Sequence, residues 1–171
     1  YGNTAYLVGG YIDDQDLIKY HANNNTFTHI PNFFPKGITC ISQGWIQMQD
    51  ILYIAGNKDE IINTFNLATL QFNVKYFTVP TNISHNDACL AGDDAQSLIY
   101  YLADDSSLQI LNISNASWSS GQNMNQQRGS HSCIFANNKL YAIGETNTVE
   151  FISTVDIKNN LWTYTTSNLS A

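Results

Sequence analysis

Residues 128–145 read RGSHSCIFANNKLYAIGE and hold two short apolar runs, 132–136 and 140–143, on either side of Asn137-Asn138-Lys139. Asparagine tolerates positive φ and hydrogen-bonds its own backbone, so this centre favours a tight turn. Gly144 then ends the second run. Two apolar runs joined in this way are typical of a β-hairpin.

A second hairpin follows directly. Val155 and Trp162 lie seven residues apart across the polar turn Lys158-Asn159-Asn160. Together, the two hairpins predict a module of four short antiparallel strands.

Three series of residues repeat this module along the chain. Tyrosines that precede a small apolar run recur at steps of 47, 47 and 41 residues: Tyr6, Tyr53, Tyr100 and Tyr141. In a second series, a large apolar residue is followed seven positions later by an aromatic residue. This pair recurs at steps of 45, 46 and 44 residues: Tyr20 with Phe27, Phe65 with Phe72, Leu111 with Trp118, Val155 with Trp162. A cysteine is expected to open a first strand, at steps of 49 and 44: Cys40, Cys89 and Cys133. Four strands in about 45 residues is the size of a β-propeller blade.

The module resembles the kelch repeat, which also builds the central domain of galactose-oxidase-like proteins. The family ends its second strand with a pair of glycines or small residues, as in Gly9-Gly10, Gly56-Asn57, Ala103-Asp104 and Gly144-Glu145. Its arginine and histidine before a first strand match Arg128 and His131. The resemblance covers nearly the whole chain through degenerate motifs, and it implies a kelch-like β-propeller segment.

We therefore predict an all-β chain and no helix, because no segment shows 3.6-residue apolar periodicity. Residues 1–171 form a single kelch-like propeller domain or part of a larger one, with about three complete blades and one partial blade. The approximate blades are 1–34 (partial), 35–80, 81–125 and 126–171. The expected strands are 4–9, 17–21 and 25–30; 38–42, 51–55, 61–66 and 71–77; 87–91, 98–103, 107–112 and 116–119; and 132–136, 139–143, 148–156 and 161–165.

The first blade begins with a second-strand pattern at residues 4–9 and lacks a first strand. Three arrangements would complete it: the tail after Trp162, further blades of a larger protein, or neighbouring chains. We expect the second arrangement, because the residues after Thr165 are few and an unclosed sheet leaves unpaired edges.

The composition excludes some classes of partner. The net charge is −7 with only seven lysines and arginines in 171 residues, which argues against nucleic acid because phosphate binding needs clustered basic residues. The chain is 43% hydrophobic and 12% aromatic, as in a globular domain. No apolar run approaches the length of a membrane span, so we predict no membrane insertion within this segment.

Five asparagines fit the acceptor pattern for N-linked glycans: Asn24, Asn82, Asn112, Asn115 and Asn168. Roughly three or four matches are expected by chance in a chain this rich in Asn, Ser and Thr. Four of the five fall in predicted turns or between blades, where a glycan can be accommodated. We therefore expect an extracellular or cell-surface glycoprotein, with a cytoplasmic protein as the alternative.

Acidic residues follow each predicted second strand: Asp13, Asp14 and Asp16; Asp59 and Glu60; Asp104 and Asp105; and Glu145. A propeller would bring these loops to one face, which we expect to be negative. Such acids usually keep a surface soluble, and a surface for cations or a basic partner is the alternative. The Asp13–Asp16 cluster lacks the spacing of an EF-hand loop, so we assign no metal site.

The three cysteines are expected to be buried free thiols, since equivalent positions of adjacent blades rarely allow a disulfide. The alternative is pairing with a cysteine outside this segment. The four histidines show no metal-ligand spacing: His21, His29, His85 and His131. His85 and His131 precede first strands and are candidates to face a central channel.

These features predict a non-enzymatic structural or protein-interaction module without a cofactor, with a protein partner or self-assembly. The expected blade anchors are Tyr6, Tyr53, Tyr100, Tyr141, Phe27, Phe72, Trp118 and Trp162. Three alternative functions compete with this one, and the kelch resemblance implies the first two. One is a secreted copper oxidase with Tyr and His ligands and a Tyr–Cys crosslink, and another is an intracellular adaptor for protein degradation. The third is a carbohydrate-binding propeller that would use Trp45 or Tyr101 if these are exposed.

Overall fold

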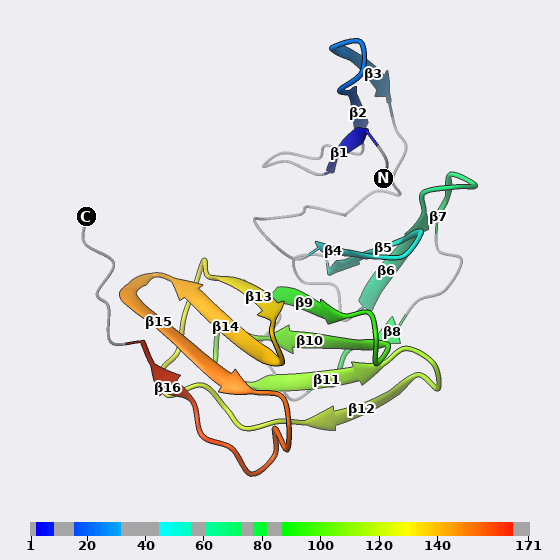
Figure 1. Cartoon of the computed structure of the whole chain (residues 1–171). Helices are drawn as coiled ribbons and strands as arrows, with labels where there is room; N and C mark the ends of the chain where they lie inside the picture. The colour runs from blue at the N-terminus through cyan, green and yellow to red at the C-terminus, as the bar shows by residue number, and fades with distance from the viewer. Residues whose placement is uncertain are drawn as a thin grey trace.

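The computed structural model describes residues 3–8, 16–31, 45–55, 61–72, 77–81 and 87–165. The secondary-structure elements in these ranges are all β-strands, and they form four antiparallel sheets in chain order (Figure 1). The prediction of an all-β chain of blade-like sheets is confirmed. Membership of the kelch family stays a prediction.

Each sheet is built from strands that are consecutive in the chain. Sheet 1 has the order β1 (Thr4–Val8), β2 (Leu17–His21), β3 (Thr26–Ile30). Sheet 2 has the order β4 (Trp45–Met48), β5 (Ile51–Ala55), β6 (Ile61–Asn66), β7 (Gln71–Phe72), and β8 (Phe77–Thr78) also pairs with β6. Sheet 3 contains β9 (Cys89–Asp93), β10 (Leu98–Leu102), β11 (Leu108–Asn112) and β12 (Ser117–Ser120). Sheet 4 contains β13 (Ser132–Ala136), β14 (Lys139–Gly144), β15 (Thr146–Ser153) and β16 (Thr163–Tyr164).

The turns follow from local sequence. Asn137 and Asn138 adopt φ values of 51° and 55° and join β13 to β14 in a two-residue turn, as Asn-rich hairpins do. Asp93 accepts a hydrogen bond from the Gln96 amide at 3.2 Å and closes the turn from β9 to β10. Gly144 has a φ of +113° at a register shift between β14 and β15, a conformation that favours glycine.

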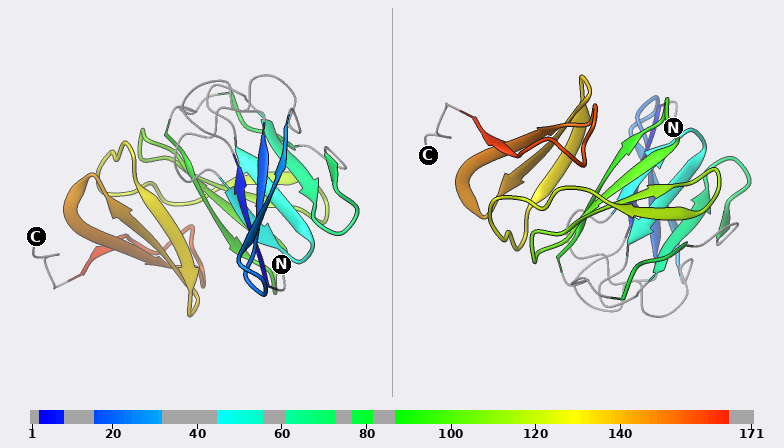
Figure 2. Two further views of the ribbon diagram at one scale, coloured as in Figure 1. Left: turned by 90° about the horizontal axis from the view of Figure 1, so that it is seen from above. Right: turned by 90° about the horizontal axis from the view of Figure 1, so that it is seen from below.

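The sheets stack on one another through both faces. We call the face turned toward the next sheet in the chain the following face, and the opposite one the preceding face. Between sheets 2 and 3, Tyr53 and Ile62 pack with Ile99, Tyr101 and Leu111. Similar clusters join sheet 1 to sheet 2 and sheet 3 to sheet 4. Sheets 1 and 4 therefore lie at the two ends of the stack (Figure 1). Two further views show sheet 4 at one side of the molecule, with sheets 1 and 2 overlapping on the other side (Figure 2).

The observed strand bounds differ from the prediction mainly in sheet 2. We call the first strand of each blade, which lies at one edge of its sheet, the inner strand. In sheet 2 the inner strand is β4, which pairs with β5 on the side opposite β6, whereas the predicted first strand 38–42 lies outside the described residues. Both ends of the predicted strand 71–77 are described, as β7 and the first residue of β8, and both pair with β6, while residues 73–76 lie outside the described ranges. Cys40, which was expected to open the first strand of this blade, also lies outside the described residues.

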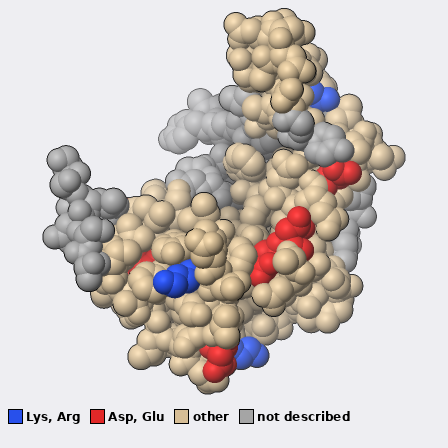
Figure 3. Space-filling model, viewed as in Figure 1, with Lys and Arg blue, Asp and Glu red and all other residues tan. Residues whose placement is uncertain are grey.

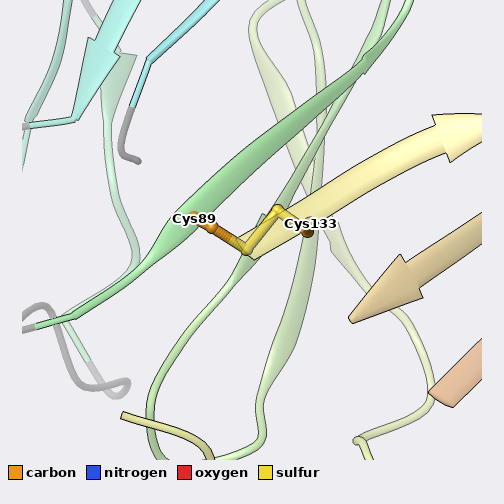
Figure 4. Close-up of a disulfide and its surroundings, with 2 residues drawn as sticks. All are labelled: Cys89 and Cys133. Carbon is orange, nitrogen blue, oxygen red and sulfur yellow. A yellow bond between two sulfur atoms is a disulfide. The ribbon is translucent and has the colours of Figure 1, made fainter. Parts of the chain in front are cut away.

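The prediction of free thiols is wrong for two of the three cysteines. Cys89 and Cys133 form a disulfide with their Cα atoms 5.9 Å apart, which links β9 to β13 (Figure 4). Their positions are not equivalent. Cys89 lies opposite Leu102, two residues after Tyr100, whereas Cys133 lies opposite Ala142, one residue after Tyr141.

That offset of one residue explains why the two sulfur atoms meet. Side chains alternate between the faces of a strand, so an odd offset moves a residue to the other face. Cys89 is on the following face of sheet 3 and Cys133 on the preceding face of sheet 4, and both belong to the cluster between these sheets.

Candidate interaction surfaces

The following face of sheet 4 carries apolar side chains that no described sheet covers. Ile134, Tyr141 and Phe151 lie side by side on neighbouring strands and so share one face. Ile134 is 53% exposed, and Tyr141 and Phe151 are half-buried with their ring centroids 5.8 Å apart. The Lys139 ammonium lies 4.4 Å from the Phe151 ring centroid. We call Ile134, Tyr141 and Phe151 the end patch.

Corresponding residues of the earlier sheets are buried. Tyr53 and Tyr100 occupy the place of Tyr141 in β5 and β10, and each packs against the next sheet with no more than 6% of its surface exposed. Thr64 and Ile110, which pair with these tyrosines, correspond to Phe151 and are also buried. The end patch thus has the composition and position of an interface between sheets.

Aromatic residues in or directly before the fourth strands lie on the preceding faces. Trp162 is 5% exposed and donates its indole N–H to the Gln122 carbonyl at 2.7 Å. Trp118 and Phe72 are half-buried against sheets 2 and 1. The prediction that Phe27 anchors two blades is wrong: it is 67% exposed, because no described sheet covers the preceding face of sheet 1, and its ring contacts Tyr20 at 5.0 Å.

A pocket of about 160 Å³ lies between sheets 1 and 2. Its lining is mainly apolar and comprises Thr4, Ala5, Tyr6, Trp45, Gln47, Leu52 and Leu67. Trp45 is 47% exposed, whereas Tyr101 is buried at 2% and cannot meet a ligand. Burial raises the pKa of Tyr6, and the Lys19 ammonium lies 5.9 Å from its ring centroid.

A buried ion pair stabilises the connection between sheets 3 and 4. Arg128 donates to one oxygen of Glu150 from Nε at 3.1 Å and from Nη2 at 2.8 Å, and both side chains are fully buried. Its remaining donors reach the Gly144 carbonyl, the Thr148 carbonyl and the Thr148 hydroxyl. The sequence pattern singled out Arg128 but did not reveal Glu150 as its partner.

His131 lies next to this ion pair and is 1% exposed. Neither ring nitrogen has a hydrogen-bond partner, and neither does Oδ1 of Asp104. Burial is the main cause that lowers the His131 pKa, and the Arg128 charge lowers it further. The Arg128 backbone near the ring raises the His131 pKa and partly offsets this lowering, although it forms no hydrogen bond with the ring. The nearby carboxylates of Asp104 and Glu145 also raise the pKa.

Four of the eight acidic residues predicted to form a negative face are described. Asp16 accepts a hydrogen bond from His29 at 2.6 Å, and Asp105 accepts one from the Ser107 amide at 2.9 Å. Asp104 and Glu145 both border residues 128–131, where the Asp104 backbone carbonyl accepts a hydrogen bond from the Arg128 amide and the Glu145 carboxylate accepts one from the Gly129 amide. Asp13, Asp14, Asp59 and Glu60 lie outside the described residues.

The view in Figure 3 shows a largely uncharged surface with a few separate acidic and basic groups. Across the described ranges, no group of three or more His, Cys, Asp or Glu side chains is placed to hold a metal ion. His21 bonds the Thr28 hydroxyl at 3.1 Å, and His85 lies outside the described residues.

Three of the five candidate glycosylation sites are described. Asn24 and Asn115 are exposed in equivalent turns before the fourth strands, where each amide oxygen accepts a hydrogen bond from the hydroxyl two residues later. Asn112 is half-buried at the end of β11 and accepts from the Ser114 amide at 3.0 Å. Asn82 and Asn168 lie outside the described residues.

Comparisons with known proteins add no family. No protein-family model matches the chain, and no curated protein matches it.

In the part of the chain that the structure describes, no helix has the length and hydropathy to cross a bilayer.

Proposed function

We propose that this chain is a non-enzymatic protein-interaction module of a secreted or surface glycoprotein, with a kelch-like stack of sheets that holds a binding surface rigid. The end patch carries this proposal. Tyr141 and Phe151 repeat positions that are buried in sheets 2 and 3, and a contiguous apolar surface of this kind is typical of a protein interface. The partner is a protein that offers an apolar sheet face of its own.

Two observations support an oxidising compartment. The Cys89–Cys133 disulfide is of a kind that persists in secreted proteins and is rare in the cytosol. Asn24 and Asn115 present exposed acceptor side chains in turns. Both features favour the secreted module over an intracellular adaptor for protein degradation.

A copper oxidase and a carbohydrate-binding propeller have less support. An oxidase with a Tyr–Cys crosslink needs a free thiol, and the two cysteines in the described ranges, Cys89 and Cys133, are bonded to each other. The carbohydrate-binding propeller has one observation in its favour, since Trp45 is half exposed at the mouth of a pocket.

The interaction proposal is tested by capture from the medium of the producing cells, with tagged wild-type chain as bait. Ile134→Asp places a charge in the end patch, and Leu161→Asp places one at a comparably exposed site in the loop before β16. A protein retained by wild type and Leu161→Asp but lost with Ile134→Asp is the expected result. The same proteins with all three baits would overturn the assignment of the end patch.

A mass measurement tests the compartment. Glycosidase treatment of the chain purified from its own cells is expected to remove mass, and substitution of Asn24 and Asn115 by Gln to abolish part of that loss. An unchanged mass would contradict the glycoprotein proposal.

A further inference from the structure

Sheet 1 differs from the other sheets at its inner edge. In sheets 2, 3 and 4 the strand that bears the repeated tyrosine, β5, β10 or β14, pairs on both sides. Tyr6 places β1 in the same position of sheet 1, yet among the described strands only β2 pairs with it. The strand that would correspond to β4, β9 and β13 is therefore the one that sheet 1 lacks within the described ranges.

The backbone of β1 is oriented to accept such a strand. The Asn3 carbonyl accepts a hydrogen bond from the Ala22 amide at 2.9 Å, so the Asn3 backbone faces the β2 side. Hydrogen-bonding groups alternate along an antiparallel strand. The backbone groups of Ala5 and Leu7 therefore also point toward β2, whereas the amides and carbonyls of Tyr6 and Val8 point to the opposite edge.

The pocket between sheets 1 and 2 lies beside this edge. Residues of β1 form one wall, and Trp45 and Gln47 on the preceding face of β4 form another, with Leu52 beneath. Its volume of about 160 Å³ is close to the roughly 150 Å³ of a cavity that binds benzene, so it has room for one large apolar side chain.

The next junction shows what normally occupies this place. At that junction the following face of the inner strand β4 packs on β9. Ile46 and Met48 of β4 lie directly over Gly92 of β9, so closely that a Cβ atom on Gly92 would lie 2.6 Å from Ile46 Cδ1. Met48 is 4% exposed at this junction. An inner strand of sheet 1 would direct its own side chains at Trp45 and Leu52 in the same way.

We infer that the edge of β1 and the Trp45 pocket form an acceptor groove for an extended segment of a second polypeptide. The segment pairs antiparallel with β1 through Tyr6 and Val8 and places one large aliphatic side chain in the pocket. Main-chain pairing supplies affinity and the pocket supplies specificity, as in other cases of strand addition. This surface is distinct from the end patch, so the inference does not depend on the proposed function.

The test uses amide hydrogen exchange by NMR on the full chain. The probe is a blocked synthetic peptide with the sequence of residues 44–50, Gly-Trp-Ile-Gln-Met-Gln-Asp, which includes the inner strand of sheet 2. At ten times its Kd, it is expected to slow exchange of the Tyr6 and Val8 amides about tenfold. The Ala5 and Leu7 amides, which face β2, are expected to change little.

A control peptide carries two prolines in place of the adjacent Ile and Gln that follow its Trp. The prolines remove two adjacent amide donors and so prevent pairing through either edge of the peptide. This control is expected to give no protection. Protection by the control, equal protection at all four β1 amides, or no protection at Tyr6 and Val8 would overturn the inference.

Two variants test the pocket. Trp45→Ala removes one wall at a half-exposed site, and is expected to weaken peptide binding about tenfold, as loss of an aromatic contact at an interface does. Phe27→Ala removes an exposed aromatic side chain away from the pocket and should leave the Kd unchanged. Equal affinity of all three proteins would exclude the pocket. A neutral oligosaccharide that shifts Trp45 without protecting Tyr6 would instead favour a sugar site and also contradict strand binding.

Discussion

Arg128 is the largest fully buried side chain among the described residues, and its charge is neutralised by Glu150. A buried ion pair of this kind costs desolvation energy, so removal of one partner is much more damaging than replacement of both by apolar residues. The ion pair holds the segment before β13 against β15, and so positions the first strand of sheet 4.

Glu150→Gln is expected to lower the free energy of unfolding by about 3–5 kcal/mol, because Arg128 keeps a buried charge without its counter-ion. Urea unfolding measures the change. Glu145→Gln is the matched control, since Glu145 is exposed, and its cost should stay below about 1 kcal/mol. Similar losses for the two variants would contradict the role of the buried pair.

His131 predicts a dependence of stability on pH. Its pKa in the folded chain lies below the ordinary value of 6.5, so the unfolded chain binds more protons between the folded pKa and 6.5. The free energy of unfolding should therefore fall as the pH drops below about 6.5 and be unaffected by this group above it. His131→Phe should remove this part of the pH dependence. Urea unfolding at about pH 8 and about pH 5 measures the free energy of unfolding of both proteins. If it changes equally between these pH values in wild type and in His131→Phe, His131 is not the cause of the pH dependence.

The aromatic residues at the fourth strands, Trp162, Trp118 and Phe27, occupy equivalent places but differ in burial. Their replacement by Ala therefore measures how much the burial of the ring contributes to stability. Trp162→Ala is expected to cost about 3–5 kcal/mol and Trp118→Ala a similar or smaller amount, because both rings pack against the preceding sheet. Phe27 occupies the same place in sheet 1, but Phe27→Ala is expected to cost less than about 0.5 kcal/mol, because Phe27 is exposed. Thermal melting in which Trp162→Ala matches Phe27→Ala would show that the sheets do not stack as described.

Strands β9 and β13 are neighbouring inner strands, and the disulfide joins them across the boundary between sheets 3 and 4. Because its ends are separated by 44 residues in the sequence, the crosslink constrains the unfolded chain across a whole repeat.

Replacement of Cys89 and Cys133 by Ala is expected to lower the free energy of unfolding by about 4 kcal/mol, from the chain entropy of a loop of this length. Reductant should destabilise wild type by a comparable amount and leave the double variant unchanged. Denaturant unfolding with and without reductant measures both effects. An equal reductant effect on wild type and the double variant would contradict the Cys89–Cys133 disulfide as the cause.

Over the whole molecule, the same type of contact between sheets occurs at every internal boundary. Middle sheets bury both faces, whereas sheet 1 exposes Phe27 and sheet 4 exposes Ile134. The stability of such stacked units depends on contacts with neighbours, so the two end faces are the surfaces with apolar area left to bury. The end patch lies on the end face of sheet 4. The acceptor groove lies between sheets 1 and 2, at the edge where sheet 1 has no described inner strand.

Much of the element order could be predicted because it depends on local chemistry. Apolar runs with β-branched and aromatic residues favour strands, and Asn137-Asn138 favours the turn between β13 and β14. The acceptor groove could not be predicted, since Trp45 belongs to a strand that the cysteine series placed several residues earlier. The end patch could not be predicted either, because Tyr141 lies in an apolar run similar to that of the buried Tyr100.

By itself, the sequence determined the strand class, the spacing of about 45 residues and most of the turns, because these depend on residues close together in the chain. Only the tertiary structure decided which side chains meet across sheets: Cys89 with Cys133, Arg128 with Glu150, and no described neighbour sheet for Phe27. The physical reason is that the face of a strand changes with every residue, so a shift of one position in a hairpin register redirects a side chain from one neighbour to another.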